Sequence, residues 1–598
     1  MFRVTVDGAE RWARPGQTAA SVLLDAGRAA WRTTRGGRPR GVFCGIGVCH
    51  DCLVVVNGVP DVRACRRAVR EGDRIETQEG ARLPCLPAAP AAPAPARDVT
   101  VPVVVVGAGP AGMAAALAAA GAGARVVLVD DGERPGGQFH RQAADGPARG
   151  AAVRAVQEHP RVEWLAGCTV WALEPGGGPS PGAQAGTDAG WTVHVLQGPA
   201  DAPARTARTL RTAALVLCTG AYDRALPFPG WDLPGVVTAG AAQALAKGQR
   251  TAIGRRVVVS GTGPFLLPVA SSLLTVGARV LGVYEAGSPA GWLRAPVAAV
   301  RDGHAKLPEL LGYAAGLARH RVPYRTRRAV VAAHGRDRVE AVTVARLAPD
   351  WRVVPGTAHR VEDVDAVCVG YGFTPQLELA LAAGCALRDR TWVAVDARQQ
   401  TSVPGVYAAG EPTGIGGAAL AAAEGELAGL AAARWAGPAE AAVPAGVAGR
   451  AAAARRRVLA GRRFARLLAA AHPVRDGWHT WLGEDTLVCR CEEVPYRVLR
   501  TAAGEPGADA AQDPHGPPAD GMCTFKLATR VGLGPCQGRI CARNAAALCG
   551  PSTLPDPQTA DRRPIAQPVR LADLAAPGPG PRDRSAPDPA EPYREDPS

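Results

Sequence analysis

A run of four valines, Val103–Val106, leads directly into the pattern Gly107-x-Gly109-x-x-Gly112. An Ala-rich stretch and a second apolar run follow, and that run ends at Asp130. Glycines in this pattern permit a tight turn, close approach of the backbone to a pyrophosphate, and close packing of a helix on a strand. The four parts together are far more specific than the glycines alone. They predict a βαβ unit that binds a dinucleotide, with Asp130 accepting hydrogen bonds from its ribose. The alternative is an α/β fold that binds no dinucleotide.

A second, less complete pattern of the same kind begins at Val257–Val259. It continues with Gly261 and Gly263, has Leu266 at the third glycine position, and is followed by an expected strand that ends near Glu285. An acid at that strand end favours NAD, because it would repel the 2′-phosphate of NADP. The pattern predicts an NAD site, and another adenine nucleotide or an empty fold remains open because Leu266 hinders close helix packing.

Cysteine spacing indicates an iron–sulfur site near the N-terminus. Cys44, Cys49 and Cys52 have the spacing C-x4-C-x2-C, and Cys65 follows after twelve residues. This is the spacing of plant-type [2Fe–2S] ligands. Structural zinc, the alternative, prefers two short cysteine pairs. We expect His50, inside the loop, to be exposed and not a ligand.

Composition excludes several classes of protein. With 598 residues, 47% hydrophobic and 20% charged, the chain should form several globular domains. The net charge of +14 comes mostly from arginines spread along the chain, so we do not expect nucleic-acid binding. No apolar run reaches the ~20 residues of a membrane helix, and the N-terminus does not look like a signal peptide. We expect a cytoplasmic protein with reduced cysteines, compatible with a peripheral position on the inner face of the membrane.

Three further segments resemble flavoproteins of the two-dinucleotide-binding superfamily: Gly136–Gln138, Leu215–Ala221 and Gly405–Glu411. The resemblance implies that FAD binds at the first site. It also implies that Glu411, at a position where Asp is commoner, holds the ribityl chain of FAD. It adds these residues to the cofactor site: Gly137, Gln138, Thr219, Gly220, Gly410 and Glu411. No cysteine pair follows Gln138, so we do not expect a dithiol mechanism.

A second cysteine set, C-x-C and then C-x4-C, resembles the bacterioferritin-associated-ferredoxin-like module. The resemblance implies a second [2Fe–2S] cluster, although four thiolates in two pairs also suit zinc. The interval between the halves is longer than usual because of an insert over 504–521. The ligands would be Cys489, Cys491, Cys536 and Cys541.

The order of parts resembles a fusion of the ferredoxin-like and FAD-binding subunits of multi-subunit amino-acid dehydrogenases. This family includes hydrogen cyanide synthase, opine oxidase, and proline and hydroxyproline dehydrogenases, and is related to the sarcosine oxidase α subunit. Residues 40–65 resemble the small subunit, whereas residues 99–550 resemble the larger one, including Phe228–Trp231 and Gly370–Pro375.

The resemblance implies an electron-transfer subunit for a glycine, proline, hydroxyproline, opine or sarcosine-like substrate. A D-amino-acid-oxidase-like FAD subunit would carry the substrate site, and a terminal acceptor would take the electrons. No residue of this chain is assigned a catalytic role. The alternative is a self-contained NADH-dependent flavin reductase that passes electrons to its fused ferredoxin domain.

The expected fold class is multidomain α/β: a β-grasp ferredoxin domain, a two-dinucleotide-binding flavoprotein core and a C-terminal [2Fe–2S] module. The expected divisions are the ferredoxin-like domain over 1–85, an Ala/Pro linker over 86–98, the FAD-binding domain over 99–225 and 366–440, an inserted NAD-binding-like domain over 226–365, a helical connector over 441–484, the C-terminal module over 485–550 and a disordered tail over 551–598.

Overall fold

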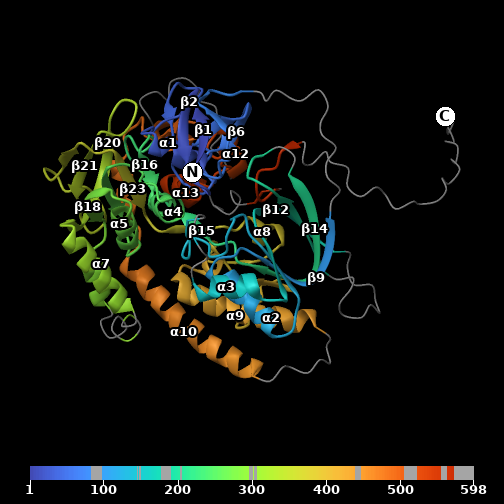
Figure 1. Cartoon of the computed structure of the whole chain (residues 1–598). Coiled ribbons are helices and arrows are strands. Elements are labelled where there is room, and N and C mark those ends of the chain that lie inside the picture. The colour runs from blue at the N-terminus through green and yellow to red at the C-terminus, as the bar shows by residue number, and fades with distance from the viewer. Residues whose placement is uncertain are drawn as a thin grey trace, which may run out of the picture.

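The computed structural model describes residues 1–82, 97–143, 146, 150–176, 190–202, 205–294, 301, 303, 306–437, 446–503, 522–553, 562–563 and 565–571. The insert expected over 504–521 lies outside these residues, as does the expected linker over 86–98 apart from its last two positions. Figure 1 shows the N-terminal domain in blue above two larger α/β units, which we call the first and second dinucleotide domains. None of the described helices is both long and apolar enough to cross a lipid bilayer.

The N-terminal domain is a mixed five-stranded sheet in the order β2-β1-β7-β5-β6, with a small second sheet in the order β4-β3-β8. Asn57 and Gly58 join β5 to β6 with φ of 53° and 79°, as a two-residue hairpin turn requires. The β-grasp prediction is confirmed. Its elements are β1 (Phe2–Val6), β2 (Ala9–Ala13), α1 (Ala19–Asp25), β3 (Arg32–Thr33), β4 (Pro39–Arg40), β5 (Leu53–Val56), β6 (Val59–Arg63), β7 (Arg74–Glu76) and β8 (Gln78–Glu79).

The first dinucleotide domain is built on a seven-stranded sheet in the order β11-β10-β9-β14-β13-β12, with β27 beside β14. Strands β11, β10, β9, β14 and β27 run parallel, and β12 and β13 extend the sheet antiparallel. Its strands are β9 (Arg97–Val106), β10 (Val126–Val129), β11 (Val162–Leu165), β12 (Cys168–Pro175), β13 (Trp191–Gln197), β14 (Thr206–Leu217) and β27 (Val406–Ala408), and its helices are α2 (Pro110–Gly121), α3 (Ala151–Glu158), α8 (Glu378–Ala382) and α9 (Gly417–Ala436).

Small residues allow α2 and α9 to touch backbone to backbone beneath this sheet. A Cβ atom on Gly425 would lie 2.0 Å from the carbonyl oxygen of Ala111, and one on Gly429 would lie 2.1 Å from that of Ala115. Any side chain at either glycine would push the helices apart. The Ala- and Gly-rich composition of these segments therefore has a packing cause.

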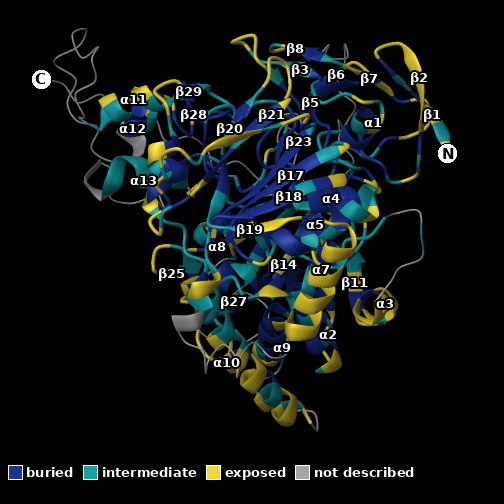
Figure 2. Ribbon diagram, turned by 90° about the vertical axis from the view of Figure 1, so that its left-hand side faces the viewer, coloured by how far each residue is buried: buried dark blue, intermediate teal, exposed yellow. Residues whose placement is uncertain are grey.

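The second dinucleotide domain has a parallel sheet in the order β16-β23-β17-β18-β19 and an antiparallel sheet in the order β20-β21-β22. Strand β23 (Ala366–Gly370) pairs with β16 and β17, so this domain ends near residue 370 and not at the expected 365. Figure 2 shows the central strands of its parallel sheet as buried and the outer face of α7 as exposed. The other elements are β16 (Val236–Thr238), α4 (Ala239–Gln249), β17 (Arg256–Gly261), α5 (Leu266–Thr275), β18 (Arg279–Glu285), η1 (Pro289–Arg294), α7 (Leu307–Arg319), β19 (Tyr324–Thr326), β20 (Arg328–His334), β21 (Ala341–Arg346) and β22 (His359–Glu362).

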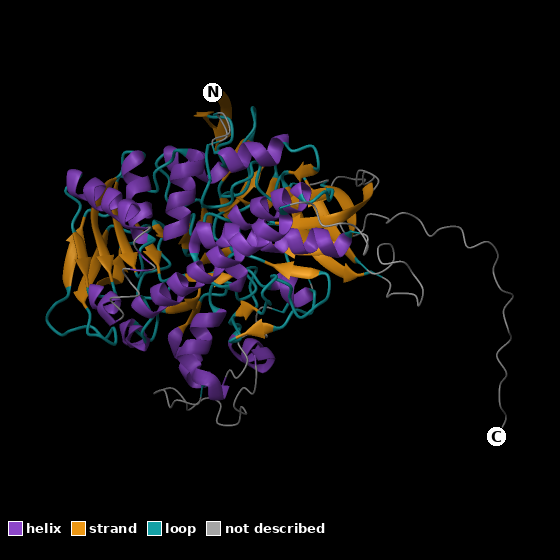
Figure 3. Cartoon of the chain, turned by 90° about the horizontal axis from the view of Figure 1, so that it is seen from below, coloured by secondary structure: helices purple, strands orange, loops and turns teal. Residues whose placement is uncertain are grey.

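Helix α10 (Val447–Ala471) connects the two dinucleotide domains along the lower side of the molecule, which Figure 3 shows from below. Its middle packs on α9 and its C-terminal end reaches η1. After α10, η4 (Asp476–Trp481) packs on the second dinucleotide domain. The C-terminal module follows, and its described elements are β28 (Leu487–Cys489), β29 (Val494–Pro495), α11 (Tyr496–Ala502), α12 (Met522–Thr529) and α13 (Ala542–Thr553).

A short part of the tail that was expected to be disordered is fixed to the core. Ala566 is buried, and its amide donates to the carbonyl oxygen of Trp171 at 2.8 Å. Arg563 forms an ion pair of 2.9 Å with the buried Glu378 on α8. For residues 562–563 and 565–571 the expectation of disorder is therefore wrong, because a buried carboxylate holds this segment.

Candidate functional site

The residues predicted to bind FAD converge at one edge of the first dinucleotide domain. Four adjacent parallel strands, β10, β9, β14 and β27, end in register there. Ligands of open α/β sheets bind outside the carboxyl ends of the strands. The residues that follow these strands are Asp130 after β10, Gly107 and Gly109 after β9, Thr219 and Gly220 after β14, and Gly410 and Glu411 after β27.

The three glycines of the turn have different surroundings. Gly107 has φ of +100°, and a Cβ there would lie 2.2 Å from the carbonyl oxygen of Cys218. A Cβ on Gly112 would lie 1.7 Å from the carbonyl oxygen of Gly107. Gly109 has no atom within 4 Å of that position. Gly107 and Gly112 therefore serve the turn and the helix contact, whereas Gly109 leaves open space of the kind that a pyrophosphate needs.

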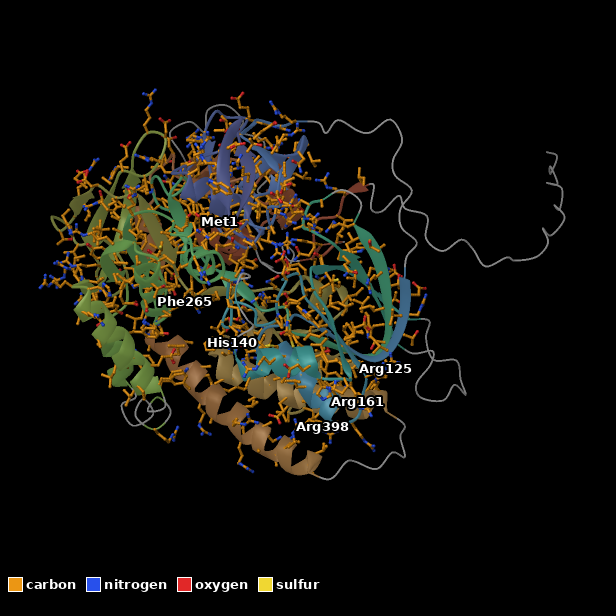
Figure 4. The ribbon with its side chains drawn as sticks, in the orientation of Figure 1. Met1, Arg125, His140, Arg161, Phe265 and Arg398 are labelled. Atoms are coloured by element: carbon orange, nitrogen blue, oxygen red, sulfur yellow. The ribbon has the colours of Figure 1, made fainter. Side chains whose placement is uncertain are left out.

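The loop that carries Gly137 and Gln138 crosses over this turn. A Cβ on Gly137 would lie 2.8 Å from the Cα atom of Gly109. Lys247 on α4 donates from Nζ to a backbone carbonyl of the loop at 3.3 Å. In the view of Figure 4, His140 of the loop lies between the two dinucleotide domains. The loop thus joins the predicted cofactor edge to the second domain.

Two half-buried carboxyl groups lie at this edge. Asp130 accepts hydrogen bonds from the amides of Ala108 at 2.6 Å and Gly132 at 2.7 Å, and burial raises its pKa to about 6. Burial also raises the pKa of Glu411, to about 7, although the amide of Gly417 donates to it. Both groups can accept or donate hydrogen bonds near neutral pH, which suits contact with ribose or ribityl hydroxyls. The hydroxyl of Thr219 instead donates to a backbone carbonyl at 2.8 Å.

The second dinucleotide domain repeats this arrangement in a more enclosed form. Glu285 is only 2% exposed, and its two oxygens accept from Thr262 Oγ1 and the Gly263 amide, both at 2.8 Å. Nδ1 of His472, just beyond α10, lies 3.7 Å from the same carboxylate. Gly263 has open space beside its Cα, whereas a Cβ on Gly261 would meet a backbone oxygen at 1.9 Å. The acid is held by the protein's own donors and covered by the end of α10.

The N-terminal cysteines form a chain of contacting thiols in which all four are buried. Cys44 hydrogen-bonds with Cys49 and with Cys65, and Cys65 hydrogen-bonds with Cys52. The amide of Asp51 donates to Cys49 Sγ at 3.5 Å. A two-iron cluster takes its four thiolates as two pairs, and the contacts supply Cys44 with Cys49 and Cys52 with Cys65.

The C-terminal cysteines form a closed ring. Sγ of Cys491 lies 3.8 Å from that of Cys489 and 3.6 Å from that of Cys536, and Cys541 hydrogen-bonds with both Cys489 and Cys536. In the described part of the chain, no group of three or more His, Cys, Asp or Glu side chains is arranged to hold one metal ion. Four buried or half-buried thiols in contact have the donor chemistry of an iron–sulfur or zinc site.

The N-terminal cysteine loop lies beside the predicted FAD edge. Arg66, next to Cys65, forms an ion pair of 3.0 Å with Asp131, next to the predicted ribose ligand. Arg63 of the N-terminal domain forms an ion pair of 2.7 Å with Asp201, which, like Asp131, belongs to the first dinucleotide domain. The predicted iron–sulfur and flavin sites are thus joined by direct side-chain contacts.

Sequence reasoning missed three features around the cysteines. His50 is buried, with 9% exposure, so the expectation that it is exposed is wrong. Asp51 forms a buried ion pair with Arg490, and Glu378 forms one with Arg539. Asp51, Arg490 and Arg539 each lie between two cysteines of a motif, and a charged residue at such a position could have been singled out from the sequence. The sequence does not identify their ion-pair partners, because these lie far away along the chain.

Two family models match the chain. The model described as pyridine nucleotide-disulphide oxidoreductase matches residues 101–425, and the one described as 2Fe-2S iron-sulfur cluster binding domain matches residues 1–80. Among solved structures, L-proline dehydrogenase from P. horikoshii covers 92% of this chain and 91% of its own, with a TM-score of 0.62 and 20% identity, which shows a shared fold.

Curated relatives agree with these models. The A subunit of opine oxidase from Agrobacterium tumefaciens is 33% identical over 496 residues, 79% of this chain and 91% of the relative. Hydrogen cyanide synthase subunit HcnB of Pseudomonas protegens is 32% identical, over 55% of this chain and 67% of its own length. Subunit HcnA of Pseudomonas aeruginosa is 44% identical over 66 residues, 11% of this chain and 64% of its own. The chain belongs to the pyridine nucleotide-disulphide oxidoreductase family, as an FAD-dependent oxidoreductase with an N-terminal [2Fe–2S] domain that is related to these oxidase and synthase subunits.

Proposed function

We propose that the chain is the electron-transferring subunit of a complex that oxidises an amine or amino acid, of the glycine, proline, hydroxyproline, opine or sarcosine type. The observation that carries the proposal is the joining of two four-cysteine groups to one FAD-binding fold in a relative of an opine oxidase subunit. A D-amino-acid-oxidase-like FAD subunit would carry the amine site, and a terminal acceptor would receive the electrons. The relatives favour this function over an NADH-dependent reductase.

The residues of the first dinucleotide domain fit FAD, because Gly109, which has open space beside its Cα, lies at the carboxyl ends of four parallel strands. Bound FAD exchanges one or two electrons, whereas a [2Fe–2S] cluster exchanges one. The chain's own task is to hold these groups close together and tune their potentials. FAD would be held by Gly107, Gly109, Gly112, Asp130, Gly137, Gln138, Thr219, Gly220, Gly410 and Glu411.

Both cysteine groups would hold [2Fe–2S] clusters. Cys44, Cys49, Cys52 and Cys65 would bind the first, and Cys489, Cys491, Cys536 and Cys541 the second. NAD or another adenine nucleotide would approach the second dinucleotide domain at the open side of Gly263. Gly261 would serve the turn, and Glu285, already bonded to Thr262 and Gly263, would have to exchange a bond to reach the ribose.

Metal analysis of anaerobically purified chain tests the redox centres. Two clusters require about four iron atoms and about four acid-labile sulfides per chain. About two irons together with one zinc would show that the C-terminal cysteines bind zinc, and would remove the second centre from the proposal.

Amine oxidation tests the function itself. With a dye as acceptor, the chain alone should oxidise none of the candidate amines, and adding the amino-acid-oxidase-like subunit should give activity and reduce the chain's FAD. Robust oxidation by the chain alone would refute the assignment. Rapid stoichiometric bleaching of the flavin by NADH would favour the reductase instead.

A further inference from the structure

The two cysteine groups, more than 400 residues apart in the sequence, are joined by one buried ion pair. Asp51 lies between Cys49 and Cys52, and Arg490 lies between Cys489 and Cys491. Arg490 Nε lies 2.8 Å from Asp51 Oδ2, and the two side chains are only 5% and 2% exposed. Neither residue takes part in the predicted binding of FAD.

Aromatic rings hold the guanidinium of Arg490 in place. Its Cζ lies 3.9 Å from the ring centroid of Phe43, which precedes Cys44, and 5.0 Å from that of Trp231. Those rings contact each other edge to face, with centroids 5.7 Å apart. Arg490 also donates to the backbone oxygen of Trp231, and Trp231 Nε1 donates to Leu487 at 2.6 Å. A planar guanidinium stacked on rings and paired with a carboxylate has little freedom to move.

Other polar contacts fix the same junction. Arg40, 1% exposed, pairs with Glu493 at 3.2 Å and with Asp232 at 3.4 Å. Thr34 donates to Glu493 at 2.8 Å. Asp51 and Arg490, each one or two residues from cysteines of its own group, are in direct contact at 2.8 Å. A charge beside one group of thiols therefore lies close to the other group as well.

We propose that the pair Asp51–Arg490 couples the two cysteine sites, fixing their loops against each other and setting their reduction potentials through opposite charges beside the ligands. This inference rests on the proposed function, because it requires a [2Fe–2S] cluster at each site. Both residues are positioning residues. Electron exchange between the sites moves one electron and changes no bond, so its direction depends only on the difference between the two potentials.

The signs of the expected shifts follow from electrostatics. Reduction adds a negative charge to a cluster, so the cation of Arg490 raises the nearby potentials and the carboxylate of Asp51 lowers them. Salt screens this buried pair weakly. Arg490→Met should lower the potentials, most at the C-terminal site, and Asp51→Asn should raise them, most at the N-terminal site. In each variant we expect the potential of the more affected site to shift by at least about 60 mV, which is a tenfold change in equilibrium constant for one electron.

The test is a mediator-poised redox titration of the full chain followed by electron paramagnetic resonance, with iron and sulfide measured in each sample. The matched control is Arg530→Met. Arg530 pairs with Glu492, next to Cys491, at 2.6 Å, but it is 65% exposed and solvent screens its charge. Its removal should shift neither potential by more than about 20 mV, roughly a twofold change in equilibrium constant. Arg490→Lys keeps the positive charge, so both potentials should lie closer to those of the wild type than to those of Arg490→Met.

Each outcome decides between the two proposals. Opposite shifts in the two single variants support coupling, since a merely structural role would not reverse sign with the charge removed. Full iron content with unchanged potentials refutes the coupling and leaves the proposed function intact. About two irons and one zinc per wild-type chain refute the second cluster and the coupling with it. If Arg490→Met loses iron, Asp51→Asn still supplies the upward shift, and Arg490→Lys, which keeps the charge, should leave both potentials near those of the wild type; unchanged potentials in Asp51→Asn then refute the coupling.

Discussion

Alanine substitutions at Gly109 and Gly112 should separate FAD binding from folding, although the two glycines lie in one turn. At Gly112 the new Cβ would lie 1.7 Å from the carbonyl oxygen of Gly107, so the backbone of α2 or β9 has to move. Overpacking of a core costs about 1–3 kcal/mol, and backbone yields less readily than a side chain. Gly112→Ala should therefore lower the melting temperature by at least about 2 °C, or prevent folding.

At Gly109 the same methyl group meets no atom within 4 Å, and φ of −70° with ψ of −175° suits any L residue. Replacing a glycine there changes folding stability by less than about 1 kcal/mol. The methyl group fills the side of the turn at which the pyrophosphate of FAD would approach. Gly109→Ala should fold normally but bind FAD at least about tenfold more weakly, a loss of about 1.4 kcal/mol.

The assay is a titration of FAD into stripped protein, followed by flavin fluorescence, together with thermal melting of each apoprotein. Gly449→Ala is the control, because Gly449 is exposed on α10 and also has no atom near its Cβ position. It should leave FAD affinity unchanged. If Gly109→Ala binds FAD as tightly as the wild type, the pyrophosphate does not lie against this turn and the assignment of the site is wrong.

Three further predictions concern stability. Glu378→Gln leaves the buried charge of Arg539 without a carboxylate and should lower the free energy of unfolding by about 3–5 kcal/mol. The measurement is the rate at which a chelator removes iron from the C-terminal site, which should rise. Glu309→Gln, which breaks an exposed ion pair, should not change that rate. The pKa of Glu411 is raised to about 7 in the folded protein, so that state binds more protons than the unfolded one and stability falls as pH rises from about 4.5 to about 7. The fall is on the order of 3 kcal/mol, and Glu411→Gln should flatten the pH profile of apoprotein melting; an unchanged slope would contradict it. Cutting the chain at a protease site inserted within 86–96 should leave the N-terminal domain bound during gel filtration, and separate elution would show that the linker alone retains it.

Local patterns predicted the features that depend on neighbouring residues. The turn at Gly107 and the hairpin at Asn57 follow from φ angles that glycine and asparagine tolerate. The sequence did not reveal that β23 belongs to the second dinucleotide domain, because a short apolar strand pairs equally well in either sheet. It also did not reveal that Arg563 finds Glu378, because composition describes a segment without its partners.

The cofactor predictions divide in the same way. Cysteine spacing is a local property, and it gave two groups whose thiols the fold does bring together. The relation between the groups depends on how distant modules dock. The pair of Asp51 with Arg490 therefore appears only in the folded chain.

The packing of the N-terminal domain explains how parts that resemble two separate subunits are held together in a single chain. Hydrogen cyanide synthase has subunits named HcnA and HcnB, and this chain is similar to both. Here the apolar core of the N-terminal domain, including Val54 and Ile75, is continuous with that of the second dinucleotide domain, including Leu245 and Leu273. An interface that shares a core and buries ion pairs fixes the orientation of its partners without help from a tether. The covalent link raises the effective concentration of the two parts, but packing determines how far the Cys44 thiol lies from the predicted FAD edge and from the C-terminal cysteines. The proposed redox centres should therefore keep the same relative position whether the parts are fused or separate.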